Sequence, residues 1–124
     1  MSFTKAPYRY RRIISLEERA EALRNKAQSV SAFSDSERVQ TSLPKDRTVY
    51  LDCAADVQRE IDTEKAILKR EQDEARTFMN SLDDSIERSF IRLRYIECRT
   101  MNECAEVLSY SERQIYSIKH KLLG

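Results

Sequence analysis

The sequence predicts an all-α fold, in which a long, coiled-coil-like helical hairpin precedes a C-terminal three-helix helix-turn-helix unit. A single glycine in 124 residues leaves few sites for the tight turns of β-hairpins. Charged residues make up 35% and aromatic residues 8% of the chain, which is typical of long helices with much exposed surface. Apolar residues recur at intervals of three and four, the helical period. We expect residues 1–80 to form an oligomerising hairpin and residues 81–124 to form the helix-turn-helix unit.

The first long helix is expected from about Tyr8 to Val30, after a loose start over residues 1–8. Its apolar residues alternate between spacings of three and four, which is the heptad pattern of coiled coils. They are Ile13, Leu16, Ala20, Leu23, Ala27 and Val30. Positive charge is unfavourable at a helix N-terminus, so the cluster of Arg9, Arg11 and Arg12 suggests phosphate contact. A solvated basic end of the helix is the alternative.

A second long helix is expected from about Thr48 to Asn80, after a connector at residues 31–47 that Pro44 should keep from being helical. Its seam again follows the heptad spacing: Tyr50, Ala54, Val57, Ile61, Glu64, Leu68, Glu71, Ala75, Phe78 and Leu82. Polar seam residues such as the two glutamates can fix register and oligomeric state. A lone hairpin with so few large apolar residues would be marginal, so we expect a homo-oligomer, a dimer or larger.

Two capping boxes near the C-terminus predict a pair of short helices. Thr100 with Glu103 is the first box, and Ser111 with Gln114 repeats it eleven residues later. The interval leaves room for about two helical turns and a break. Ala105 lies where the two helices would cross, and its small side chain allows a close approach.

A third helix, from Ser85 to Cys98, is expected to pack on this pair and to be capped by Asp83 or Asp84. It carries cations at Arg88, Arg92 and Arg94.

The second helix of the pair has the features of a DNA recognition helix. Such a helix presents its first residues to base edges and its later residues to phosphates. Arginine pairs well with guanine, and serine or tyrosine can add polar or stacking contacts. The candidate DNA-binding residues are Ser111, Glu112, Arg113, Gln114, Tyr116, Ser117, Lys119, His120 and Lys121, with Arg94 and Arg99 as phosphate contacts from the preceding segment.

The charge distribution predicts that one copy of this unit binds DNA weakly. Net charge is +1 for the whole chain, and residues 81–124 hold seven cationic and seven anionic side chains. Non-specific affinity depends on neutralising phosphates, so we expect the oligomer to be the binding species. A fragment of residues 81–124 should then bind more weakly than the full chain.

The stretch IRLRYIECRTMNECAEVLSYSERQIYSIKHKLL resembles the region 4 helix-turn-helix of sigma-70-type factors. The L-R-Y, the NECAEVL helix and the serine that opens SERQIYSIKHKLL carry this likeness. Residues 10–123 resemble a small phage or prophage family of sigma region 4-like proteins, in which a helical hairpin with a loop like SERVQTSLPKD comes first. The resemblance implies DNA binding. Ser109 replaces the usual glycine of the turn, and Glu112 adds a carboxylate beside the expected phosphates.

Three functions remain open. The first is a phage or prophage transcriptional regulator that binds double-stranded DNA. The second is a DNA-packaging protein similar to a small terminase subunit, which a ring-shaped oligomer would favour. The third is an interaction module that docks on RNA polymerase without reading DNA, which the low charge of residues 81–124 favours.

Catalysis, cofactors, metal ions and membranes are not expected. The chain has no glycine-rich phosphate loop, and its one histidine lies on the exposed side of the recognition helix. Three cysteines without a CxxC pair indicate a reducing cytosol. The resemblance to phage proteins implies that this is the cytoplasm of a bacterial host. No apolar run approaches the roughly 18 residues of a membrane span.

Overall fold

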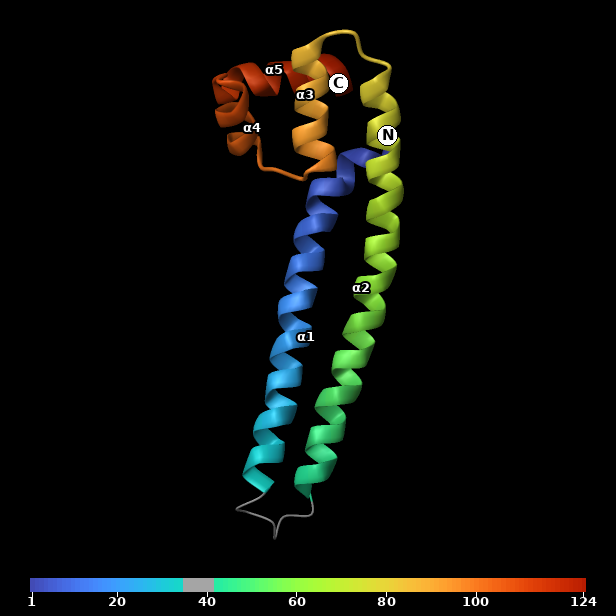
Figure 1. Cartoon of the computed structure of the whole chain (residues 1–124), viewed down its shortest axis with the longest axis vertical. Coiled ribbons are helices and arrows are strands. Elements are labelled where there is room, and N and C mark those ends of the chain that lie inside the picture. Colours follow the sequence, from blue (N-terminus) through green and yellow to red (C-terminus); the bar gives the residue numbers. More distant parts are fainter. Residues whose placement is uncertain (35–41) are drawn as a thin grey trace. The chain divides into compact units, whose positions relative to one another are not determined.

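The computed structural model describes the backbone of residues 1–34 and 42–124, and the side chains of residues 1–29 and 47–124. The prediction of an all-α fold is confirmed, because the described residues form helices and no strand (Figure 1). In chain order the elements are η1 (Ser2–Lys5), α1 (Ala6–Ser34), α2 (Ser42–Asn80), α3 (Ser85–Ile91), η2 (Arg92–Ile96), α4 (Met101–Leu108) and α5 (Glu112–Leu123). No described helix is long and apolar enough to cross a membrane.

The chain divides into two compact units, at different boundaries from those predicted. One unit contains residues 11–65, and the other joins residues 1–10 to residues 66–124. The C-terminal helices therefore share a unit with the first ten residues and with the last part of α2. A division at residue 80 would separate elements that pack together in one core.

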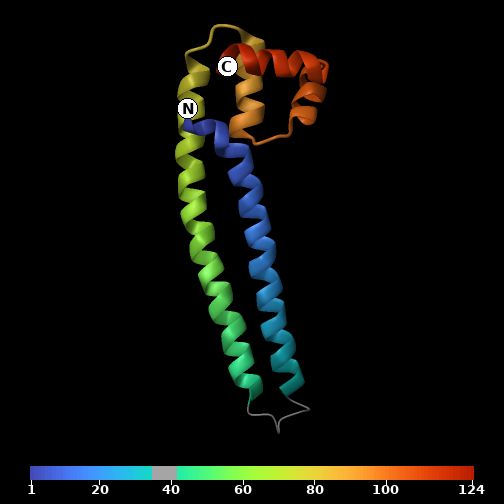
Figure 2. The same ribbon diagram turned by 180° about the vertical axis from the view of Figure 1, so that it is seen from behind.

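Residues 11–65 form an antiparallel pair of helices that lie side by side in both views (Figures 1 and 2). The predicted seam is confirmed where side chains are described. Its buried members are Ile13, Leu16, Ala20, Ala27, Ala54, Val57 and Ile61. Leu23 and Tyr50 are half-buried, and the side chain of Val30 lies outside the described residues. Alanines at three of these positions let the two backbones approach closely.

The connector between the long helices is shorter than predicted. Helix α1 continues to Ser34 and α2 begins at Ser42, so only residues 35–41 of the expected loop at 31–47 fall outside the described backbone. Pro44 lies in the first turn of α2, and the expectation that it excludes helix there was wrong. A first-turn residue needs no N–H donor within the helix, and the fixed φ of proline suits that position.

Polar pairs cross the hairpin from α1 to α2. The guanidinium of Arg12 lies 2.7 Å from Glu60 and 3.7 Å from Glu64, and Lys65 lies 3.1 Å from Glu17. These pairs are at least partly exposed, so each contributes little stability. These pairs help to fix the register of the two helices, because a shift of one helix along the other would separate the paired charges. Arg12 therefore contacts carboxylates of its own chain, which weakens the interpretation of the basic cluster as phosphate contacts.

The C-terminal unit is built around an aromatic cluster that includes the start of the chain. Phe3 is fully buried, with its ring centroid 5.4 Å from that of Phe78 and 5.3 Å from that of Tyr95. Tyr95 also meets Phe90 edge to face at 6.0 Å. The expected loose start was wrong, since η1 brings Phe3 into the core and its backbone N–H donates to Glu74.

The second seam glutamate forms a buried ion pair in this unit. Glu71 is 4% exposed, and its Oε1 accepts a 2.7 Å hydrogen bond from Nε of Arg9. Arg9 is therefore committed to an internal carboxylate, like Arg12 in the hairpin. The two glutamates that interrupt the apolar seam thus both face arginines of α1.

Candidate nucleic-acid interface

Helices α3, α4 and α5 pack together and share a core with the aromatic cluster. Asp84 caps α3, and its carboxylate accepts from the backbone N–H groups of Ile86 and Glu87 at 2.8 and 3.1 Å. The helix widens into the π-helical turn η2 before it ends at Ile96. The predicted helix from Ser85 to Cys98 is therefore formed by α3 together with η2. It ends two residues before the predicted end.

Both predicted capping boxes are confirmed. Oγ1 of Thr100 accepts from the Glu103 backbone N–H at 3.1 Å, and the Glu103 carboxylate accepts from the Thr100 N–H at 2.9 Å. Ser111 and Gln114 repeat the arrangement at 3.2 and 2.8 Å. Each box satisfies two backbone donors that a helix start would leave unpaired. The start of α5 is therefore held in a defined orientation.

The turn between α4 and α5 is left-handed at a residue that is not glycine. Ser109, which stands in the usual glycine position, has φ 58° and ψ 38°. The conformation costs a serine roughly 1 kcal/mol or more, because Cβ approaches the following carbonyl. The turn is closed by a 3.0 Å hydrogen bond from the Tyr110 N–H to the Ala105 carbonyl.

Helix α5 has one buried face and one polar face. Ile115 is fully buried, while Ile118 and Leu122 are half-buried against the same core. Ala105 of α4 is 4% exposed, consistent with close packing of the pair. The opposite face presents side chains that form no hydrogen bond or ion pair with any described residue. They are Arg113, Tyr116, Ser117 and His120.

The other predicted contacts on α5 have different surroundings. Ser111 and Gln114 are exposed but are held in the capping box. Lys119 is half-buried, and Glu112 is exposed. Nζ of Lys121 lies 2.7 Å from Glu87 of α3, and this hydrogen bond raises the pKa of Lys121.

The side of α5 next to α3 is acidic. A hollow there is lined by two carboxylates, an isoleucine of α3, a tyrosine of the turn and three residues of α5. These are Asp84, Ile86, Glu87, Tyr110, Ser117, Ile118 and Lys121. Asp84 and Glu87 would repel a DNA phosphate in this hollow. The charge of Lys121 is already paired with the carboxylate of Glu87.

Arg94 does not belong to the DNA-binding set. Its side chain is 6% exposed, its Nη1 donates to the Arg99 carbonyl at 2.8 Å, and its guanidinium lies over the ring of Tyr8. A buried guanidinium cannot reach a phosphate of docked DNA without leaving the core. The predicted role of Arg94 was therefore wrong, and the side chain instead holds the segment before α4. Arg99 is half-buried and pairs with Glu97 at 3.0 Å, which raises its pKa.

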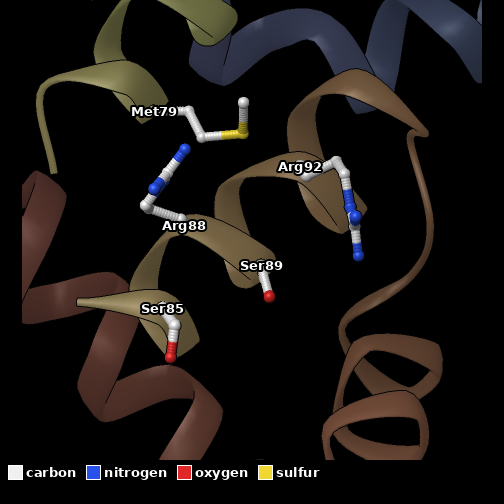
Figure 3. Close-up of a pocket in the computed structure, with 5 residues that line it drawn as sticks. All are labelled: Met79, Ser85, Arg88, Ser89 and Arg92. Atoms are coloured by element: carbon white, nitrogen blue, oxygen red, sulfur yellow. The ribbon is translucent and has the colours of Figure 1, made fainter. Parts of the chain in front are cut away.

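A basic surface on α3 was not among the predicted contacts. Its open hollow of about 250 Å³ is lined by Ser85, Arg88, Ser89 and Arg92, with Met79 of α2 at the edge (Figure 3). The spacing of three, four and seven residues puts these side chains on one helix face. That spacing is visible in the sequence. The sequence does not show, however, that Arg88 and Arg92 are exposed whereas Arg94 is buried.

Helix α4 contributes no cation. Its exposed side chains are polar, acidic or apolar, namely Asn102, Glu103, Glu106 and Val107. Within the described residues no cluster of histidine, cysteine or acidic side chains could hold a metal ion. Between residues 85 and 123, the exposed cations therefore lie on α5 and on the outer face of α3 with η2.

Comparison of the chain with protein-family models, with curated proteins and with solved structures found no match.

Proposed function

We propose that this chain is a DNA-binding transcriptional regulator of phage or prophage type, which reads its site with helix α5. The observation that carries this proposal is the outer face of α5, where Arg113, Tyr116, Ser117 and His120 are exposed and have no partner among the described residues. A rigid helix with an unoccupied polar face is the form in which helix-turn-helix proteins present side chains to the major groove.

The first two turns of α5 would make the base contacts. Arg113 lies in the first turn and Ser117 follows one turn later, so both can approach base edges of neighbouring pairs. The guanidinium of Arg113 suits the O6 and N7 acceptors of guanine. His120, a further turn along, would lie near a phosphate. The capping box fixes the start of the α5 backbone before binding, which lowers the entropy lost in the complex.

The weak charge of residues 81–124 favours binding by an assembly of chains. Seven cations in that range are balanced by seven anions, and Lys121 and Arg99 are already paired internally. Two copies on one DNA molecule would gain affinity through the effective concentration of the second copy. The proposal therefore includes a homo-oligomer in which the long helices bring copies together.

The test is fluorescence polarisation on duplexes selected from a random-sequence pool by the full chain. Arg113→Ala should weaken binding to the selected duplex by about 1–3 kcal/mol and should change binding to random DNA much less. Lys69→Ala removes an exposed cation of α2 and serves as the matched control. Failure of the wild-type chain to enrich any sequence, together with no salt-dependent binding, would contradict the proposal.

A second candidate function is docking on a protein such as RNA polymerase. The observation that favours it is the pair of large exposed side chains on the two helices, Val107 at 53% and Tyr116 at 52% exposed, combined with the acidic surface of α4. Tyrosine is enriched at the centres of protein interfaces. Co-purification with polymerase that is lost in Val107→Ser, from a chain without DNA affinity, would select this function.

A further inference from the structure

We propose that the outer face of α3 contacts the phosphate backbone of DNA, as a second contact surface in addition to α5. The surface consists of Ser85, Arg88 and Ser89 of α3 and of Arg92, the first residue of η2, and we call it the α3 face. The inference rests on the proposed DNA-binding function and extends it, because it names a part of the interface that carries affinity without sequence preference.

The chemistry of the α3 face suits phosphate oxygens. Its hollow is lined by two guanidinium groups and two hydroxyl groups, and by no carboxylate. The hollow beside α5 differs, since Asp84 and Glu87 line it. The hollow of the α3 face therefore presents hydrogen-bond donors to an anion and has no negative charge in its lining, unlike the hollow beside α5. Arginine and serine are among the commonest side chains at DNA phosphates.

The two arginines of the α3 face are available for such a contact. Arg88 is exposed, and its side chain forms no hydrogen bond or ion pair with another described residue. Arg92 makes only a 3.5 Å contact through its Nε to Glu97, whose carboxylate is closer to Arg99 at 3.0 Å. The terminal nitrogens of Arg92 remain free to donate, which distinguishes this residue from the buried Arg94.

The directions of the side chains favour an extended polyanion over a single phosphate ion. In Figure 3, Arg88 extends upwards towards Met79, whereas the guanidinium of Arg92 extends downwards, as the hydroxyl groups of Ser89 and Ser85 also do. Two guanidinium groups that point apart cannot clamp one ion between them. They can contact different phosphates along one strand, with the serine hydroxyl groups between them.

The test measures how affinity depends on salt. The full chain, Arg88→Gln/Arg92→Gln and a matched control, Arg19→Gln/Arg70→Gln, are titrated against a selected duplex and a random duplex by fluorescence polarisation. Arg19 and Arg70 are exposed residues of α1 and α2, so the control removes the same charge elsewhere. Circular dichroism verifies that each variant keeps its helices.

Loss of two phosphate contacts should make the negative slope of log K against log salt less steep, by about 1.8. At 0.1 M salt the same slope corresponds to about an eightfold loss of affinity per arginine, equal for the selected and the random duplex. The control should keep the wild-type slope. An unchanged slope in the Arg88→Gln/Arg92→Gln variant overturns the inference, even if Arg113→Ala shows that α5 reads DNA.

The remaining outcomes separate this inference from the proposed function. If Arg113→Ala has no effect on any duplex while the α3 variant loses affinity and slope, the reading role of α5 fails and the α3 face stands. If the wild-type chain binds no duplex, both fail. Calorimetric titration with inorganic phosphate should show no saturable binding; saturable binding that the α3 variant loses would identify a free phosphate ion as the ligand and overturn the backbone contact.

Discussion

Truncation of Phe3 should loosen the helix-turn-helix core, although about ninety residues of sequence separate this side chain from Tyr95. Phe3 is fully buried and packs on the rings of Phe78 and Tyr95. Burial of a phenylalanine side chain contributes about 1.5–3 kcal/mol, and each aromatic pair adds about 0.5–1.5 kcal/mol. Their sum agrees with the roughly 3–5 kcal/mol that Phe→Ala substitutions cost in protein cores.

Hydrogen exchange followed by mass spectrometry can locate this loss. The chain has two compact units, so a single global unfolding curve would mix them. In Phe3→Ala, protection of the amides of residues 90–96 should fall by about a hundredfold or more, since each 1.4 kcal/mol is a factor of ten. Tyr10→Ala, which removes an aromatic ring that is 41% exposed, is the control. Less than a tenfold loss of protection in Phe3→Ala would refute the assignment of Phe3 to this core.

Four further predictions concern individual side chains. Glu71→Leu should destabilise its unit by about 3 kcal/mol in hydrogen exchange, since it removes a buried carboxylate from Arg9, and adding Arg9→Met should recover most of the loss; equal effects of the single and double variants would argue against the pair. Ser109→Gly should stabilise the turn by about 1 kcal/mol, measured by hydrogen exchange of the amides of α4 and α5, because glycine adopts positive φ without a Cβ clash; a loss of protection would contradict this. Burial raises the pKa of Cys104 from 9.0 to about 11, so between these values the unfolded chain loses a proton that the folded chain keeps, and stability should fall as pH rises. At pH 8 iodoacetamide should modify the exposed Cys53 before Cys104, and the reverse order by mass spectrometry would show that Cys104 is accessible.

The long helices and the capping boxes were predictable because their signals are local or periodic. The heptad spacing placed Ile61 and Leu68 in the seam, and both are buried. A capping box needs only two residues three apart, so Thr100 and Ser111 marked the starts of α4 and α5 within one residue. In each case the residues that determine the structure lie within a turn or two of the structure itself.

The errors at Phe3 and Arg94 have a common physical origin in contacts between distant parts of the chain. Residues 1–5 are too few to show a period, so the sequence held no sign that Phe3 enters a core whose other members lie beyond residue 74. Arg94 has the same chemistry as Arg88 and Arg92. Its burial follows from the packing of Tyr8 over it and from the backbone carbonyl of Arg99, which no local pattern shows.

This packing changes what a fragment experiment on residues 81–124 would measure. The fragment was expected to bind DNA weakly because it lacks the helices that bring copies together. It also lacks Phe3, Ala75 and Phe78, which belong to the core on which α3 packs. Loss of those contacts would unfold the fragment and abolish binding whatever the oligomeric state. The dependence of affinity on oligomerisation must therefore be tested in the full chain, by comparing its molar mass by light scattering with its DNA affinity over the same range of protein concentration. Affinity that stays constant through dissociation to monomers would show that a single helix-turn-helix unit is sufficient.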